Sequence, residues 1–126
     1  MSTLNPCTIV FLIKDSSVLL ALKNWGEGVA GTLIGPGGKI KLDETPLECA
    51  IRETQEEIGV TILNPEHVGY VEFDFTSSPN GRITTGEVYL CTEWHGIPHS
   101  SEELENPTWY PIAKLPVDKM SPEKRF

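Results

Sequence analysis

The sequence predicts a mixed α/β fold of the α+β kind, in which helix covers one sheet of mixed strand directions. Three observations lead to this prediction. Apolar, β-branched runs lie on both sides of one long amphipathic segment, that segment carries helix start and stop signals, and 126 residues suffice for a core. We therefore expect residues 1–126 to form a single domain.

Apolar runs near the N-terminus predict the first strands. Residues 7–13 form a continuous run rich in β-branched side chains, which is typical of a buried strand. A polar turn at 14–17 joins this run to a second one at 18–22, so we expect a hairpin. A glycine-containing loop, a short strand and a glycine turn are expected next, at residues 23–31, 32–34 and 35–38.

The helix is the best-marked element of the chain. Thr45 and Glu48 form a capping box around Pro46, and Gly59 is the expected left-handed terminator. Between these signals, residues that suit a core recur with helical spacing and predict one buried stripe: Leu47, Ala50, Ile51, Thr54 and Ile58.

The second half of the chain predicts another hairpin. Polar and apolar residues alternate over 67–75, and a long strand-like run at 83–94 follows a turn at 78–81. An acidic loop, a short strand and a single helical turn are expected after it, at residues 99–106, 108–111 and 112–115. Residues 121–124 resemble a helix start, so we expect the closing helix to be incomplete at Phe126.

Composition limits the partners of this chain. The net charge is −8, with acids concentrated at 43–57 and 102–105, so nucleic acid and anionic membranes are poor electrostatic partners. No segment approaches the roughly 20 apolar residues of a membrane span, and no signal-peptide pattern is visible. Cys7, Cys49 and Cys91 lie far apart in apolar surroundings and are expected to be buried thiols. We expect a cytoplasmic protein.

Three glutamates on the helix suggest a metal site. Glu53, Glu56 and Glu57 are spaced i, i+3 and i+4, so they share one helical face beside the apolar stripe. Their mutual repulsion destabilises the helix and raises carboxylate pKa values unless a cation is present. Mg²⁺ prefers oxygen ligands and binds through one or two carboxylates together with substrate phosphates.

A glycine turn and a lysine precede these acids. Gly37 and Gly38 permit close approach of the backbone to the helix or to a phosphate, and Lys39 offers a positive charge. The alternative is a solvated acidic face with Arg52 paired to Glu48 and Glu56. That alternative explains neither the glycine turn nor the lysine.

The residues from Gly38 to Val60 resemble the Nudix box, GX5EX7REUXEEXGU, where U is aliphatic. Thr54, at the first U position, is the one departure, and it affects packing more than chemistry. The resemblance implies a Nudix-type α/β/α sandwich with a mixed central sheet. The positions that match are Gly38, Glu44, Arg52, Glu53, Glu56, Glu57, Gly59 and Val60.

The resemblance also implies hydrolysis of a nucleoside diphosphate linked to another group, with Mg²⁺ or Mn²⁺ as cofactor. Glu53, Glu56 and Glu57 would be the metal ligands, and a backbone carbonyl at Gly37 or Gly38 would add an oxygen. Arg52 would orient the glutamates, with Glu44 as a further carboxylate at the edge of the site.

The general base is left open between two sources. One is Glu53, and the other is a glutamate outside the box. Glu102, Glu103 and Glu105 of the acidic loop are the outside candidates, of which we favour Glu103. His67, His95 and His99 show no metal-ligand spacing and are assigned no role.

Outside the box, the C-terminal part is similar to the MutT-type 8-oxo-dGTP diphosphatases. Glu123 stands where that family places a carboxylate that contacts the base. Ile34, Ser121 and Lys124 depart from the family pattern at base-contacting positions, so base recognition is expected to be relaxed or different. Trp25, Tyr70 and Phe73 are alternative stacking residues.

Three functions are therefore compared. The first is a nucleoside triphosphate pyrophosphohydrolase, acting on NTPs or dNTPs including 8-oxo-dGTP and releasing a monophosphate and pyrophosphate. The second is a Nudix hydrolase for ADP-ribose, sugar nucleotides or dinucleoside polyphosphates. The third is a non-catalytic nucleotide-binding module, which has no need of the complete acidic set. A monomer or a weak homodimer is expected.

Overall fold

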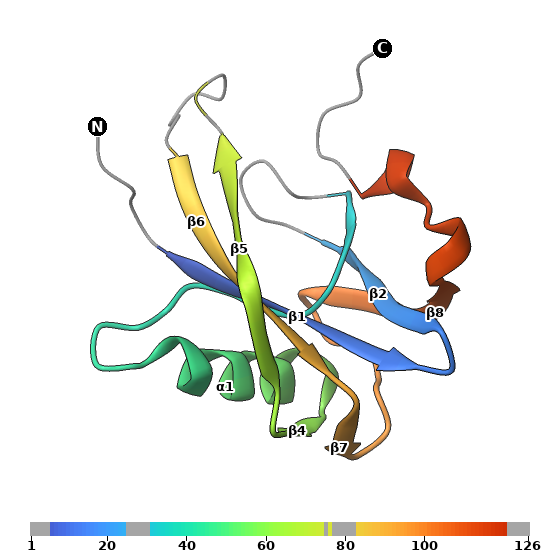
Figure 1. Ribbon diagram of the computed structural model, residues 1–126, viewed down its shortest axis with the longest axis horizontal. Helices are drawn as coiled ribbons and strands as arrows, with labels where there is room; N and C mark the ends of the chain where they lie inside the picture. Colours follow the sequence, from blue (N-terminus) through green and yellow to red (C-terminus); the bar gives the residue numbers. More distant parts are fainter. Residues whose placement is uncertain (1–5, 25–30, 75, 77–82, 121–126) are drawn as a thin grey trace.

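The computed structural model describes residues 6–24, 31–74, 76 and 83–120, and these form one mixed sheet, a small two-stranded ladder and one α-helix (Figure 1). The strands of the main sheet follow the order β3-β2-β1-β6-β5, and β8 also pairs with β2. Their bounds are Cys7–Lys14 for β1, Ser17–Lys23 for β2, Leu33–Ile34 for β3, Glu66–Asp74 for β5, Ile83–Cys91 for β6 and Leu104–Pro111 for β8.

Strand directions make this a mixed sheet, as predicted. β1 pairs with β6 in parallel, with Cys7 opposite Gly86 and Leu12 opposite Cys91. The other pairs of the sheet are antiparallel, including the two predicted hairpins β1–β2 and β5–β6. The predicted turn at 78–81 lies outside the described residues.

The helix α1, Pro46–Ile58, has the predicted signals at both ends. The Thr45 hydroxyl accepts from the Glu48 N–H (3.1 Å), and the Glu48 carboxylate accepts from the Thr45 N–H (2.9 Å). Gly59 adopts the left-handed conformation with φ of 74° and donates its N–H to the Gln55 carbonyl. These contacts satisfy backbone groups that the helix cannot satisfy internally.

The buried face of α1 differs from the predicted stripe. Ala50, Thr54 and Ile58 are buried as expected, but Leu47 in the first turn is 43% exposed. The remaining buried positions of α1 are Cys49 and Glu57, because that side packs against β1 and the glycine turn. The core-facing side of the helix is thus rotated toward its carboxylates.

The core lies between α1 and one face of the sheet. Val10 and Leu12 of β1, Leu19 and Ala21 of β2, and Tyr89 and Cys91 of β6 belong to one buried cluster with Ala50 and Ile58 of α1. The burial of Cys49 and Cys91 agrees with their prediction as buried thiols, whereas Cys7 is only partly buried. Burial of apolar area of this kind is the main force that holds α1 on the sheet.

Two features were not predicted. β8 begins at Leu104, inside the segment predicted to be a loop, because Leu104 is fully buried and pairs with Lys23 of β2. The long run predicted at 83–94 is interrupted after Cys91, and a separate strand β7, Glu93–His95, pairs with β4, Thr61–Leu63. Both β4 and β7 are too short to give a recognisable alternation.

The last described residues form two short 3₁₀ turns. These are η1, Ile112–Lys114, where one helical turn was predicted, and η2, Val117–Lys119. The helix start expected at 121–124 lies outside the described residues. Among the described residues, no helix combines the length and apolar character needed to cross a bilayer.

The capping box predicts a measurable contribution to stability. Thr45→Ala removes the acceptor for the Glu48 N–H and should lower the free energy of unfolding by about 1 kcal/mol. Thr45→Ser, which keeps the hydroxyl, should lose much less. Urea denaturation of both variants measures the difference, and equal losses in the two would show that the cap is not the cause.

Candidate active site

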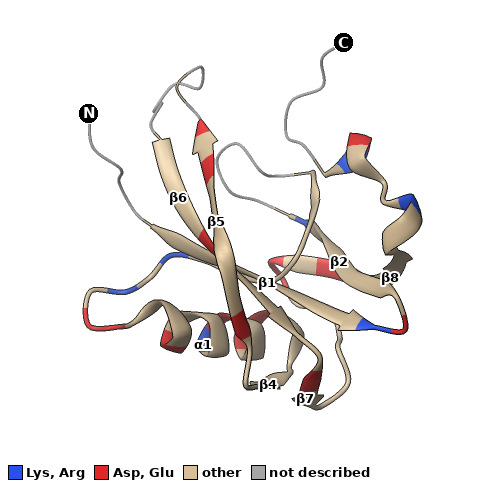
Figure 2. Cartoon of the chain, in the orientation of Figure 1, with Lys and Arg blue, Asp and Glu red and all other residues tan. Residues whose placement is uncertain are grey.

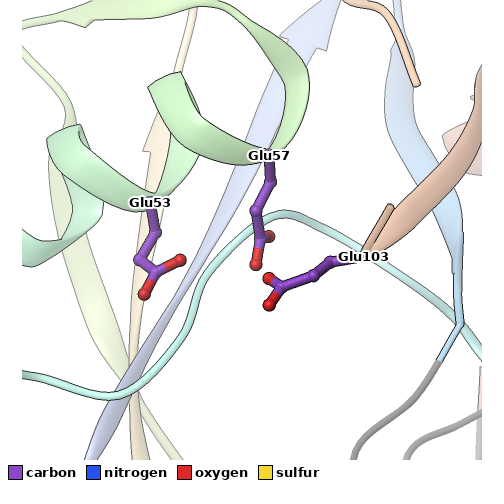
Figure 3. A group of neighbouring side chains, drawn as sticks. All are labelled: Glu53, Glu57 and Glu103. Carbon is purple, nitrogen blue, oxygen red and sulfur yellow. The ribbon is translucent and has the colours of Figure 1, made fainter. Parts of the chain in front are cut away.

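Three glutamates converge at one point of the structure (Figure 3). Single carboxylate oxygens of Glu53, Glu57 and Glu103 all lie within 4.8 Å of one another. Glu57 is only 3% exposed, and Glu53 and Glu103 are partly buried. Such a set of hard oxygen donors suits a divalent cation.

Two different segments bring these side chains together. Glu53 and Glu57 are one helical turn apart on α1 and therefore point the same way. Glu103 lies immediately before β8, and the pairing of Leu104 with Lys23 carries it to the helix. In Figure 2, acidic positions mark both α1 and the segment that leads into β8.

The glycine turn forms the floor beside the cluster. The Gly37 N–H donates to Glu57 Oε1 (3.0 Å). A Cβ at Gly37 would lie 1.9 Å from the Thr8 carbonyl oxygen, and a Cβ at Gly38 would lie 2.5 Å from Glu53 Oε2. Gly37 needs glycine because any side chain would collide with the backbone of β1, whereas a side chain at Gly38 would displace the Glu53 carboxylate.

Arg52 organises the outer side of the cluster. Its guanidinium donates through Nη1 to Glu53 Oε2 (3.0 Å) and Glu56 Oε1 (3.2 Å), and through Nη2 to the Lys39 carbonyl (3.2 Å). It also forms a two-point contact with Glu44 through Nε and Nη2. Arg52 pairs with Glu56 but not with Glu48, whose carboxylate closes the helix cap.

The contact with Arg52 stabilises the ionised state of Glu44. The hydrogen bond from Arg52, followed by the one from the Lys41 N–H, lowers the pKa of Glu44 to about 2. Charge-assisted, two-point pairs between arginine and carboxylate are among the strongest hydrogen bonds in proteins. The Arg52 side chain is therefore held in one orientation by its contact with Glu44.

Burial is the main influence on the pKa values of Glu57 and Glu53. It raises the pKa of Glu57 to about 9, and a side-chain hydrogen bond with Glu103 acts in the same direction. Burial also raises the pKa of Glu53, against the opposing effect of Arg52. Both effects favour the protonated form of Glu57, and a bound cation would oppose them by favouring the ionised form.

Lys23 is a neighbour of this site that the sequence analysis did not identify. Its ammonium lies 3.8 Å from Glu57 Oε2 and is 18% exposed. Lys23 is the polar residue that directly follows an apolar run, and this was the sequence feature that could have identified it. The predicted phosphate ligand Lys39 has an exposed side chain, and its contacts in the described part of the chain are made by backbone atoms.

The other predicted residues lie around the cluster. Glu56 is 56% exposed and bonded to Arg52, so it is outside the three-carboxylate set. It lines a pocket of about 350 Å³ with Glu57, Ser101, Glu102 and Glu103. Glu105 is exposed on β8, and Ile34 packs against the core from β3. Trp25 and Glu123 lie outside the described residues.

Comparisons with known proteins show similarity over most of the chain. Residues 3–125 match the model of the NUDIX domain. The oxidized purine nucleoside triphosphate hydrolase of Mus musculus is 32% identical over 126 residues, which cover 100% of this chain and 78% of that protein. The 8-oxo-dGTP diphosphatase of Escherichia coli K12 is 34% identical over 109 residues, with coverages of 86% and 81%.

Solved structures share the fold. The crystal structure of the MutT NUDIX hydrolase from Burkholderia pseudomallei superposes with a TM-score of 0.81 at 24% sequence identity, covering 89% of this chain and 86% of that chain. A MutT protein from Bacillus halodurans gives a TM-score of 0.69 at 27% identity, with coverages of 86% and 69%. The expected mixed α+β fold is confirmed.

The raised carboxyl pKa values predict that the metal-free protein loses stability as pH rises. Folded Glu57 keeps a proton up to about pH 9, whereas an unfolded glutamate releases it near its ordinary pKa of 4.5. The free energy of unfolding should therefore fall between about pH 5 and pH 8. Glu44 does not oppose this, since its stabilising effect is lost only as pH falls toward 2.

Urea denaturation in EDTA across this pH range measures the effect. Glu57→Gln, which cannot ionise, should flatten the decrease, and Glu72→Gln on the exposed part of β5 should not. A wild-type stability that rises with pH over this range would contradict the assignment.

Proposed function

This chain belongs to the Nudix family and is a Nudix hydrolase, and from that premise we propose that it converts nucleoside triphosphates and water into a nucleoside monophosphate and pyrophosphate. Oxidised purine nucleotides such as 8-oxo-dGTP are the proposed preferred substrates. The observation that carries the proposal is the convergence of Glu53, Glu57 and Glu103 behind the glycine turn. The names of the mouse and Escherichia coli relatives support the substrate class.

Nudix hydrolases use divalent metals, and the residues of this site fit such an ion. The donors are carboxylate oxygens, and Arg52 and Lys23 offset only part of their mutual repulsion when all are ionised. The Gly37 N–H bonds one oxygen of Glu57 and leaves the other facing the cluster. We propose Mg²⁺ or Mn²⁺, held by Glu53 and Glu57, with Glu56, one oxygen of Glu103 and the Gly37 carbonyl as further candidates. The ion would neutralise phosphate charge and make water a stronger nucleophile.

The remaining roles follow from position. Arg52 fixes the orientation of Glu53 and Glu56 through its hydrogen bonds. Glu103 is the proposed general base, since its carboxylate lies at the cluster yet comes from a separate segment. Lys39, with its exposed ammonium, and the backbone of Gly37 and Gly38 are the proposed phosphate contacts. Glu123 is the proposed base-reading residue.

A substrate screen tests the proposal. Purified protein with Mg²⁺ is offered 8-oxo-dGTP, the ordinary NTPs and dNTPs, ADP-ribose, diadenosine tetraphosphate and sugar nucleotides, with product identification. Monophosphate and pyrophosphate from a triphosphate are the expected products, with 8-oxo-dGTP turned over most efficiently. Preferred cleavage of ADP-ribose or a dinucleoside polyphosphate would move the chain to another substrate class, and no turnover at all would indicate a binding module.

The metal ligands can be tested in the same assay. Glu57→Gln should lower kcat by about 100-fold or more, because removal of even an outer-shell partner of a metal ligand costs about 10- to 100-fold. The loss should not be recovered by raising the Mg²⁺ concentration. Activity within twofold of wild type would remove Glu57 from the proposed ligand set.

Glu103 and Glu105 form a matched pair for testing the general base. Both are glutamates at the start of β8, but only Glu103 reaches the cluster. Glu103→Gln should lower kcat by about 100-fold and remove the acidic limb of its pH profile, the usual effect of losing a general base. Glu105→Gln should stay within about twofold of wild type. Equal losses of kcat in the two variants would mean that the overall negative charge of this segment matters, and not a catalytic role of Glu103.

A further inference from the structure

Glu103 is the least constrained of the three converging glutamates. Glu53 and Glu57 are fixed by the backbone of α1, whereas Glu103 comes from the segment that joins β7 to β8. Its carboxylate faces two others across distances of no more than 4.8 Å. Like charges at this spacing repel. Contacts outside the cluster must therefore hold the Glu103 backbone in place.

Asn24 makes these contacts from the end of β2. Its backbone N–H donates to the Glu103 carbonyl (2.9 Å), and its side-chain Nδ2 donates to the Glu102 carbonyl (2.7 Å). One carbonyl precedes the Cα of Glu103 and the other follows it. Because peptide groups are planar, holding both carbonyls restricts the two backbone dihedral angles of Glu103 and so the direction of its Cα–Cβ bond.

The neighbouring contacts fix other residues of the same segment. The Ser101 N–H donates to the Leu104 carbonyl (2.8 Å), and the Leu104 N–H donates to Ser101 Oγ (3.3 Å), which closes a turn around Glu102 and Glu103. Leu104 itself is anchored by full burial. The Leu104 N–H belongs to the peptide group that follows Glu103, so its bond to Ser101 helps to hold that group. Among the described residues, the peptide group that precedes Glu103 is held by the bond from Asn24 Nδ2 to the Glu102 carbonyl.

We propose that Asn24 is a positioning residue of the active site, which holds the Glu102 and Glu103 carbonyls so that the Glu103 carboxylate completes the oxygen donor set with Glu53 and Glu57. This inference rests on the proposed metal-dependent function. Asn24 acts through Glu103 only. Its side-chain amide is occupied by the Glu102 carbonyl.

The test is a double-mutant cycle read by Mn²⁺ binding. Mn²⁺ affinity is measured by electron paramagnetic resonance, without nucleotide, for wild type, Asn24→Ala, Glu103→Gln and the double variant. Asn24→Ala should weaken Mn²⁺ binding by about 10-fold, as is typical when the partner of a ligand is removed. In the Glu103→Gln background the same change should have less than about a twofold effect, because the side chain that it positions no longer binds.

Ser100→Ala is the matched control. Ser100 Oγ accepts from the Asn106 N–H (3.0 Å), so this variant also loses one side-chain hydrogen bond of the same segment, but away from Glu103. Its Mn²⁺ affinity should equal that of wild type. Thermal unfolding in EDTA establishes that each variant is folded, and Asn24→Ser replaces Asn24→Ala in the cycle if the latter is not.

Two results would overturn the inference. One is an Mn²⁺ affinity of Asn24→Ala equal to that of wild type. The other is full additivity with Glu103→Gln, which would mean that Asn24 supports the fold in general. Both results are Mn²⁺ affinities measured without nucleotide, so they do not depend on hydrolysis. An absence of turnover in the substrate screen would refute the proposed function, whereas additivity in the cycle would refute the positioning role alone.

Discussion

The burial of the Glu57 carboxylate is the constraint around which the site is built. A carboxylate with 3% exposure carries a large desolvation cost when ionised, and two further carboxylates beside it add repulsion. Such a group persists only if the surrounding structure offers compensating partners. The Gly37 N–H, the Lys23 ammonium and the hydrogen bond with Glu103 are those partners. Each of them requires a particular piece of the fold to be in place.

Different cations offset the negative charge of the carboxylates on the two sides of the acidic face of α1. On the outer side, Arg52 is a permanent cation that ties Glu44, Glu53 and Glu56 into one network. On the inner side, the positive charge near Glu57 is weaker and more distant, since Lys23 stands 3.8 Å away. The inner side is therefore where an additional cation gains most.

The local features of the fold were predictable because their causes are local. The capping box at Thr45, the terminator at Gly59 and the two hairpins depend on residues close together in sequence, and all are present. Leu47 shows the limit of this reasoning, because helical spacing gives the apolar stripe but not the rotation of the helix. That rotation is set by packing against Thr8 and Gly37, which are distant in sequence.

The site was predictable to a similar extent. The spacing on one helix brought Glu53 and Glu57 together correctly, whereas the placement of Glu103 and Lys23 depends on the pairing of β2 with β8. Short sequence patterns contain no information about such pairing. The favoured choice of Glu103 among three acids agrees with its position in the cluster, although its catalytic role is still a proposal. Glu56 lies outside the cluster of three and is bonded to Arg52, which also bonds Glu53, and its role as a ligand is still a proposal.

The parallel pairing of β1 with β6 has a consequence for how the protein folds. β1 is near the start of the chain, yet one of its edges is completed only by residues 83–91, and β2 is completed by residues 104–111. Contacts between such distant segments form slowly because a long loop must close first. During synthesis, most of the chain must therefore leave the ribosome before the main sheet can close. Glu103 then joins Glu53 and Glu57 only at a late stage, when Leu104 beside it enters the apolar core.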